Sequence, residues 1–392
     1  MKRLYGVRQS YAWGSPDEIP AILGSTADGL PFAEYWLGTH VLGSATLNDG
    51  QRLGDYLSHH PETLGQASLE TFGPQLPFLL KLLSARSPLS LQAHPSREQA
   101  EVGYAKESLL ALPIDSPQRS FRDDWPKPEA IVAITPFDGL VGFRDPHETA
   151  AMFDALGLAE TLSEVIGPLR ERAATPALQQ VFLRVLTLGD ERHLVDEVVS
   201  AAVNHLDQPG RVGTFARTAV EIDEHFPGDP GILAALLLHR FHLEPGEALA
   251  LQPGIMHSYL HGTAIEVMAN SDNVLRGGLT AKHIDVDGLL DVVNFDPTPV
   301  QLVTPRGSDG VYLYPTSTPE FELWLVQPVM HNGTQLPRPD AGEVCLATSG
   351  NFVLSGDEQP LRLRQGEAAF VPAGESVSVT GDGQLFVASS GV

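Results

Sequence analysis

Three separated segments of the sequence carry side chains suited to holding one divalent metal ion: SLQAHP at 90–95, KPE at 127–129 and MHSY at 256–259. Their candidate ligands are Gln92, His94, Glu129 and His257. Gln92 and His94 are two residues apart, so on a β-strand both side chains project from the same face. The set offers only nitrogen and oxygen atoms, which suits zinc and, less strongly, manganese, cobalt or iron.

His94 and His257 differ from the other histidines because each stands in an apolar, strand-like context beside further polar residues. Burying such groups without partners is costly. A metal site satisfies them. A buried hydrogen-bond network of the same side chains without metal is the structural alternative.

The charge balance narrows the choice of partners. The chain has 49 acidic and 25 basic residues, a formal charge of −24. Such a field repels nucleic acid and anionic membranes, so neither is an expected partner. A small anion remains a candidate if the few basic residues gather at one place. Two of the five lysines stand at informative positions, because Lys127 precedes Glu129 and Lys282 follows Arg276.

Composition also predicts the compartment. The longest wholly apolar run, 232–238, is far shorter than the roughly 20 residues of a membrane helix, and the N-terminus has no apolar signal segment. Cys345 is the single cysteine, so no internal disulfide is expected. We expect a cytoplasmic protein, and a monomer, while leaving an oligomer open.

The pattern of apolar residues divides the chain. Short apolar runs broken by Gly and Pro predict mainly strands up to about residue 144, with a helix around 97–110. From 146 to 240 the spacing is helical, as at Leu178, Val181, Phe182, Val185 and Leu186. Strand and turn patterns return at Leu243.

A nine-residue repeat follows. Gly246–Gly254 (GEALALQPG) resembles Gly366–Gly374 (GEAAFVPAG), which predicts the same turn, strand and turn in both copies. Three residues later stand His257 in the first copy and Val377 in the second. We therefore expect two related β-domains, of which only the first binds metal. This arrangement resembles the cupin fold, a jelly-roll barrel with an internal metal.

Several motifs in order resemble one family, type I mannose-6-phosphate isomerase (phosphomannose isomerase). They are YAWG at 11–14, AEYWLGTH at 33–40, LPFLLKLLSARSPLSLQAHP at 76–95, KPE at 127–129, TPFDGLVGFR at 135–144, FPGDPG at 226–231, PGEALALQPGIMHSYL at 245–260 and EVMANSDNVLRGGLTAK at 266–282. The resemblance departs at Trp125-Pro126, where the family commonly has Asn-His, and at Arg86-Ser87, which lacks the usual lysine before Pro88.

The resemblance implies a role for each matching residue. It makes Gln92, His94, Glu129 and His257 the ligands of one zinc ion per chain. It makes Arg276 an active-site residue, with Glu266 and Lys127 as the other catalytic candidates. The positions that match the sugar-phosphate pocket are Ser90, Lys81, Tyr259, Asp272 and Lys282. Arg276 and Asp272, four residues apart, also offer a simple ion pair with each other.

The implied reaction interconverts mannose 6-phosphate and fructose 6-phosphate through an enediol. It needs electrostatic stabilisation of the enediolate and a group that moves a proton between neighbouring carbons. Glu266 is the preferred proton shuttle, Lys127 its competitor, and Lys282 and Ser90 are candidate phosphate partners. The alternatives are an isomerase of another aldose and a non-catalytic cupin that binds sugar phosphate.

The predicted fold class is mainly β with a helical insertion: two cupin-like jelly-roll β-barrel domains plus an α-helical domain. The expected boundaries are 1–145 with 241–300 for the metal-binding cupin, 146–240 for the helical insertion and 301–392 for a cupin-like domain without metal ligands.

Overall fold

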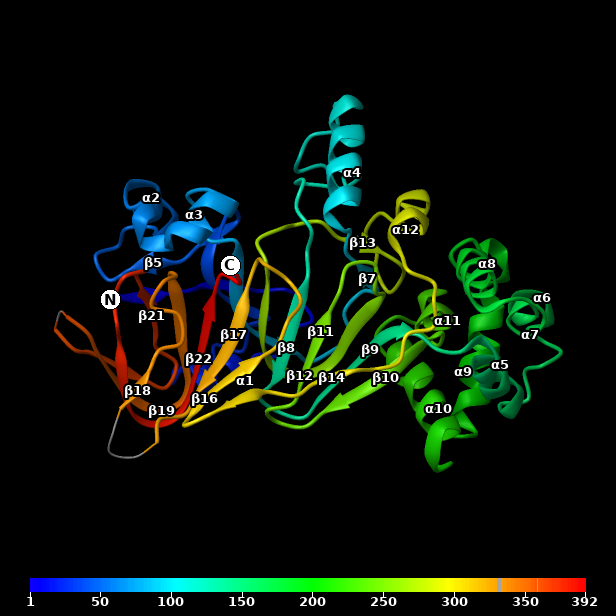
Figure 1. Cartoon of the computed structure of the whole chain (residues 1–392). Coiled ribbons are helices and arrows are strands. Elements are labelled where there is room, and N and C mark those ends of the chain that lie inside the picture. The colour runs from blue at the N-terminus through cyan, green and yellow to red at the C-terminus, as the bar shows by residue number, and fades with distance from the viewer. Residues whose placement is uncertain (330–332, 358) are drawn as a thin grey trace.

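The structure, a computed structural model, describes residues 1–329, 333–357 and 359–392. It contains two β-sheets, with a group of helices at the end remote from both chain termini (Figure 1). The predicted class, mainly β with a helical insertion, is confirmed. The domain boundaries at 145, 240 and 300 stay predictions.

The first sheet carries the three segments with candidate metal ligands. Its central path runs β14-β11-β8-β12-β6-β3-β2, and β9, β10, β7, β13 and β4 extend it. The strands are β2 (Val7–Gln9), β3 (Glu34–His40), β4 (Gly43–Ser44), β6 (Phe78–Ala85), β7 (Gln92–Ala93), β8 (Glu129–Ala133), β9 (Phe137–Phe143), β10 (Leu238–Leu243), β11 (Ala248–Leu251), β12 (His257–Ala269), β13 (Leu275–Arg276) and β14 (Leu302–Val303).

The second sheet contains the C-terminal strands and also two strands from the start of the chain. Its order is β15-β16-β17-β22-β19-β21-β1-β5, with β18 beside β22 and β20 beside β19. The strands are β1 (Lys2–Tyr5), β5 (Thr46–Leu47), β15 (Arg306–Ser308), β16 (Val311–Tyr314), β17 (Glu322–Val326), β18 (Thr334–Gln335), β19 (Glu343–Ser355), β20 (Leu361–Arg364), β21 (Ala368–Val371) and β22 (Ser378–Ser389). The N-terminal strand β1 therefore ties the start of the chain to its C-terminal part.

The stretch predicted to be helical is helical. It consists of α5 (Pro146–Ala155), α6 (Ser163–Ile166), α7 (Pro168–Glu171), α8 (Ala174–Leu186), η2 (Gly189–Arg192), α9 (His193–Val203), α10 (Gly210–Asp223) and α11 (Gly231–Ala235). In α8 the predicted apolar face is buried at Leu178, Val181, Phe182 and Val185. This face packs into a core shared with β7 and β9, so the helices cover one end of the first sheet.

The remaining helices lie between strands. They are α1 (Glu18–Ile22), α2 (Leu53–His59), η1 (Pro61–Leu64), α3 (Gln66–Phe72), α4 (Arg97–Leu109) and α12 (Val286–Val292). The helix predicted at 97–110 is α4. Ser96 begins it with a capping box, because the Ser96 hydroxyl accepts from Gln99 N and the Gln99 side chain accepts from Ser96 N. None of the described helices has the length and apolar composition needed to cross a lipid bilayer.

The two sheets pack face to face through one apolar core. Leu80 and Leu82 of β6 and Ile265 and Val267 of β12 meet residues of β17, β19, β21 and β22, such as Phe370, in this core. Because side chains alternate along a strand, the residue between Leu80 and Leu82 and the residue between Ile265 and Val267 point to the opposite face of the first sheet. That opposite face holds the candidate functional residues.

The nine-residue repeat has the same backbone in both copies. The first copy forms β11 and the second β21, and Gly246 and Gly366 have φ of 91° and 82°. A carboxylate stabilises each turn, because Glu247 accepts from Glu244 N at 2.8 Å and Glu367 accepts from Arg364 N at 2.7 Å. The predicted equivalence is confirmed. His257 begins β12, whereas Val377 is a core residue of the second sheet.

Candidate metal centre and active site

Three neighbouring strands, β6, β8 and β12, carry charged side chains on the face of the first sheet that is opposite the core between the sheets. The pairing of β6 with β12 sets Lys81 opposite Glu266, and the pairing of β8 with β12 sets Glu129 opposite Met268. Each of these charged residues alternates with apolar residues whose side chains enter the core between the sheets. Strand register therefore gathers charges that are far apart in the sequence.

His94, Glu129 and His257 form a compact buried triad. Their candidate ligand atoms all lie within 4.8 Å of one another. Glu129 lies between the two rings, with Oε1 3.3 Å from His94 Nε2 and Oε2 3.4 Å from His257 Nε2. Gln92, the fourth predicted ligand, pairs with His257 through the backbone of β7 and β12. The strand at Gln92 is shorter than predicted, and His94 follows directly after its end.

The hydrogen bonds of the triad fit a bound cation. His94 Nδ1 lies 2.7 Å from the carbonyl oxygen of Asn273, and His257 Nδ1 lies 2.9 Å from that of Ile255. Each Nδ1 therefore donates, which leaves each neutral ring with a lone pair on Nε2, facing a carboxylate. His94 Nε2 is buried and has no hydrogen-bond partner within the described residues. Lone pairs turned toward a carboxylate repel it unless a cation lies between them.

The protonation states agree with this reading. Burial and the nearby charge of Lys127 lower the pKa of His94 to about 4, so the ring is neutral at pH 7. Burial raises the pKa of Glu129, but the charge of Lys127 and the contacts with the His94 and His257 rings outweigh burial and hold that pKa well below its usual range. Neutral imidazoles and an ionised carboxylate are the forms that bind divalent metals.

A second buried cluster surrounds Lys81. Lys81 Nζ lies 2.8 Å from Glu266 Oε2 and 3.5 Å from Glu34 Oε1. Tyr259 donates its hydroxyl hydrogen to Glu266 Oε1 at 3.0 Å. Burial lowers the pKa of Lys81, but the carboxylates of Glu266 and Glu34 outweigh it and raise that pKa above its ordinary value. Lys81 is thus a charged residue inside the protein.

A cavity of about 590 Å³ adjoins both clusters. The predicted site residues that line it are Lys81, Ser90, Gln92, Lys127, Asp272, Arg276 and Lys282. The metal triad lies next to the cavity through Gln92 and through Lys127, whose Nζ is 2.9 Å from Glu129 Oε1. Tyr259 and Glu266 are not among the lining residues, and Glu266 contacts the lining through its ion pair with Lys81.

Three of the cations that line this cavity have no carboxylate partner within the described residues. Arg122, Arg276 and Lys282 line it, and no carboxylate in the described part of the chain pairs with any of them. Burial and the charge of Arg122 lower the pKa of Arg276. Burial and the charges of Arg276 and Arg122 lower the pKa of Lys282. Cations that act on one another in this way favour the entry of an anion.

Asp272 does not pair with Arg276. His40 Nδ1 accepts a hydrogen bond from Leu42 N, so His40 Nε2 carries the hydrogen and donates it to Asp272 Oδ1 at 3.2 Å. Burial raises the pKa of Asp272, but the hydrogen bond from His40 together with the nearby charges, among them Lys127 and Arg122, outweighs burial and lowers that pKa. His40 and Arg122 were missed by the sequence reasoning. His40 ends the AEYWLGTH motif, which was its only available signal, and Arg122 had none.

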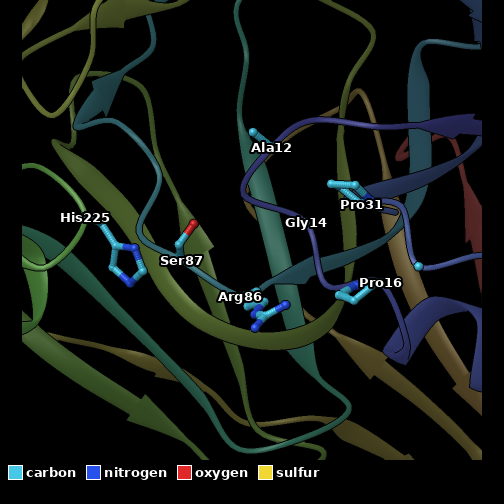
Figure 2. Close-up of a pocket in the computed structure, with 8 residues that line it drawn as sticks. Ala12, Gly14, Pro16, Pro31, Arg86, Ser87 and His225 are labelled. Carbon is cyan, nitrogen blue, oxygen red and sulfur yellow. The ribbon is translucent and has the colours of Figure 1, made fainter.

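A smaller cavity of about 290 Å³ adjoins the first and shares Ala12, Ser87 and His225 with it. Figure 2 shows Ser87 and His225 on one side of this cavity and Pro16 and Pro31 on the other. His225 comes from the helical insertion, between α10 and α11. The insertion therefore contributes to the wall of both cavities.

Comparison with known proteins identifies the family. A protein-family model described as the catalytic domain of type I phosphomannose isomerase matches residues 1–146. Mannose-6-phosphate isomerase of Salmonella typhimurium is 35% identical over 98% of both chains. The chain belongs to the type I phosphomannose isomerase family. Its human relative, also a mannose-6-phosphate isomerase, is 31% identical over 95% of this chain and 93% of its own.

Solved structures of phosphomannose isomerases have the same fold. A crystal structure of mannose 6-phosphate isomerase bound with zinc and yttrium matches with a TM-score of 0.91 and 32% identity, covering 100% of both chains. A zinc-bound holo structure matches with a TM-score of 0.91 and 33% identity, covering 100% of this chain and 99% of its own. The predicted membership of this isomerase family and the predicted fold class are confirmed.

Proposed function

We propose that the chain is a metal-dependent aldose-ketose isomerase that interconverts mannose 6-phosphate and fructose 6-phosphate. The observation that carries the proposal is the juxtaposition of a buried His94-Glu129-His257 triad with a cavity lined by three cations that lack a carboxylate partner in the described part of the chain. A sugar phosphate offers both groups that such a site needs, oxygens at the reacting carbons and a dianion at the other end. The names of the relatives support the same substrates.

We assign one zinc ion per chain to His94, Glu129 and His257, with Gln92 as the fourth ligand. When bound, a divalent cation polarises the carbonyl and hydroxyl oxygens of the sugar and stabilises the negative charge of the enediolate. The buried hydrogen bonds from the histidines to Asn273 and Ile255 hold both rings in the ligand tautomer. Zinc is favoured over other divalent metals because two related structures contain it.

Arg276 and Lys282 bind the phosphate end of the substrate in this proposal, and Ser90 donates a further hydrogen bond. The guanidinium and ammonium groups suit a dianion because they donate charge-assisted hydrogen bonds. Asp272 lies in the same cavity, where His40 fixes its orientation. Asp272 accepts hydrogen bonds from sugar hydroxyls, which orients the ring and excludes water around it.

The proton transfer has two candidates, and their positions differ. Lys127 lines the cavity, whereas Glu266 is not among the lining residues and is bound by Lys81 and Tyr259. A base must come within hydrogen-bond reach of the proton that it removes. We therefore propose that Lys127, after its ammonium group has released a proton, takes the proton from one carbon of the substrate and returns it to the neighbouring carbon. Glu266, preferred on sequence grounds, keeps Lys81 charged and in place.

Solvent hydrogen exchange distinguishes these two assignments. Glu266→Gln retains exchange of the transferred hydrogen with solvent, at a rate within about tenfold of wild type, since it leaves Lys127 untouched. Lys127→Met loses exchange by about 10²- to 10⁴-fold, the usual contribution of a general base. Loss of exchange in Glu266→Gln, with retention in Lys127→Met, would return the role to Glu266.

One assay tests the function itself: conversion of mannose 6-phosphate to fructose 6-phosphate, measured before chelation, after chelation and after zinc is restored. We expect activity that chelation abolishes and zinc recovers. No turnover under any divalent metal, with sugar phosphate still bound, would favour the non-catalytic cupin. Faster turnover of another aldose or aldose phosphate would favour the related isomerase.

The proposal extends to the protein's setting. We propose a monomeric, cytoplasmic enzyme without a nucleic-acid partner, and the formal charge of −24 supports the last point. Light scattering of the zinc-loaded protein tests the monomer, and a mass twice that of the chain would overturn it.

A further inference from the structure

Asn273 contacts both ends of the active site, one through its backbone carbonyl and the other through its side-chain carboxamide. Asn273 is fully buried, and its own carbonyl oxygen accepts the hydrogen bond from the metal ligand His94. Its side-chain Oδ1 accepts from Arg122 N at 2.7 Å and from Asp123 N at 3.2 Å. Its Nδ2 donates to Asp123 O at 2.8 Å and to Trp125 O at 2.9 Å. One residue thus contacts the candidate metal centre and the loop that carries Arg122.

The loop at 122–125 is further attached to the same segment by Asp123. Asp123 Oδ1 accepts from the hydroxyl of Ser271 at 2.7 Å, and Oδ2 accepts from Asp272 N at 2.8 Å. Arg276 lies only three residues after Asn273, in strand β13, which pairs with β7. These bonds fix the backbone of Arg122 against the segment that leads to Arg276. The backbone of Arg122 at the cavity is therefore held in place by specific hydrogen bonds.

The side chain of Arg122 differs from that of its neighbour Arg119, although both line the cavity. The guanidinium of Arg119 is engaged within the protein, because it donates hydrogen bonds to Phe121 O, Leu112 O and Ser108 Oγ. Within the described residues, no hydrogen bond or ion pair engages the guanidinium of Arg122. In a chain with twice as many acidic as basic residues, a cation fixed at a cavity without a carboxylate partner is available to a ligand.

We propose that Arg122 is the third cation of the phosphate site and sets the preference for phosphorylated over free sugars, and that Asn273 is the residue that positions it. The inference rests on the proposed function, because it takes the sugar phosphate as the ligand. Arg122, Arg276 and Lys282 surround the dianion, and a free sugar gains nothing from Arg122. Asn273 couples this end of the site to His94 at the other.

Steady-state kinetics of Arg122→Gln provide the first test. A hydrogen bond to a charged group contributes about 1.5–3 kcal/mol, so KM for mannose 6-phosphate rises roughly 10- to 150-fold while kcat changes less than threefold. Competitive inhibition by inorganic phosphate weakens by a similar factor, and zinc content is unchanged. Arg86→Gln is the matched control: Arg86 is exposed, lines only the smaller cavity, and its loss leaves KM and phosphate inhibition at wild-type values.

Asn273→Ala tests the positioning role. If Asn273 acts through Arg122, KM rises in Asn273→Ala, and the double variant with Arg122→Gln has a KM no higher than the worse single variant. If the two substitutions raise KM by factors that multiply in the double variant, Asn273 acts independently of Arg122 and its role is merely structural. An unchanged KM and an unchanged phosphate inhibition in Arg122→Gln would overturn the role of Arg122, even if Asn273→Ala does not fold.

A direct binding measurement separates this inference from the proposed function. Calorimetric titration of the zinc-loaded wild-type protein and of Arg122→Gln with inorganic phosphate needs no turnover. Weaker binding by the variant supports the phosphate site even if the wild-type protein does not isomerise mannose 6-phosphate. Equal binding by both proteins overturns the inference while leaving the isomerase reaction intact.

Discussion

Lys81 and Glu266 face each other across the pairing of β6 with β12, with Lys81 Nζ 2.8 Å from Glu266 Oε2. Both side chains are buried, and Lys81 is also 3.5 Å from Glu34. Removing one partner of a buried ion pair leaves an uncompensated charge, which costs about 3–5 kcal/mol. Lys81→Met should lower the free energy of unfolding by that amount, measured by urea denaturation of the metal-free protein.

The matched control neutralises the carboxylate as well. Lys81→Met combined with Glu266→Gln should recover a large part of the loss, because a neutral amide is easier to bury than a carboxylate. A loss below about 1 kcal/mol in Lys81→Met alone is the size of a surface pair and would contradict the buried pairing.

Zinc should stabilise the fold through the triad. A ligand present at 1,000 times its Kd adds about 4 kcal/mol to stability, so zinc should raise Tm of the chelated protein by several degrees. Glu129→Gln and His257→Ala should lose most of this zinc-induced rise. The readout is the difference in Tm with and without zinc, followed by differential scanning calorimetry.

Val377→Ala supplies the control for the triad variants, because Val377 occupies the position equivalent to His257 in the second copy of the repeat. It should lower Tm through loss of core packing but keep the full zinc-induced rise. A zinc-induced rise in Tm that survives in His257→Ala but is lost in Val377→Ala would place the metal in the second sheet and contradict the triad.

Glu343 should make stability fall as the pH rises. Its carboxyl group is buried in the second sheet, Oε1 accepts from Arg338 N at 2.9 Å and Oε2 has no partner within the described residues. Burial raises the pKa of Glu343 from 4.5 to about 7. Between these values the folded protein holds a proton that the unfolded chain has released. The stabilisation is therefore complete below about pH 4.5 and is lost as the pH rises through about 7.

Glu343→Gln isolates this dependence, because the amide does not titrate. Urea denaturation at pH 5 and at pH 8 gives the free energy of unfolding at each pH. Between these two values it should fall by up to about 3 kcal/mol more in wild type than in the variant. Parallel losses in both proteins would mean that Glu343 is ionised in the fold.

The two equivalent glycines of the repeat should tolerate alanine differently. Both have positive φ, so each substitution costs about 1–2 kcal/mol of backbone strain. A Cβ at Gly246 meets nothing within 4 Å, whereas a Cβ at Gly366 would lie 2.5 Å from Leu23 Cα. Gly366→Ala should therefore lower the free energy of unfolding by about 1–3 kcal/mol more than Gly246→Ala, which is the usual cost of overpacking. Urea denaturation of both variants measures this difference. Equal losses would show that α1 moves away freely.

Much of the architecture is readable from local patterns. The apolar spacing of α8, the capping residues of α4 and the glycines of the repeat act over at most a few turns, and the structure confirms all three. The clustering of His94, Glu129 and His257 is also confirmed, although they stand far apart in the sequence. Their chemistry limits the choices, because buried ionisable groups of this kind need partners.

Other features had no local signal. Asp272 stands four residues from Arg276, yet it pairs with His40, more than 200 positions away. Arg122 enters the cavity because Asn273 holds its loop, and β1 joins the C-terminal sheet by pairing with β21. None of these contacts follows from residue spacing, since each depends on how separate strands and loops are brought together.

The sequence by itself determined the candidate ligand types, the alternation of strands and helices and the repeat that distinguishes His257 from Val377, because these depend on side-chain chemistry and on short-range periodicity. The tertiary structure alone decided which charges meet. Strand register puts Lys81 beside Glu266. Strand β13 and two loops bring Arg276, Arg122 and Lys282 to one cavity, without carboxylate partners in the described chain. Electrostatic interactions act through space, so only the folded arrangement fixes them.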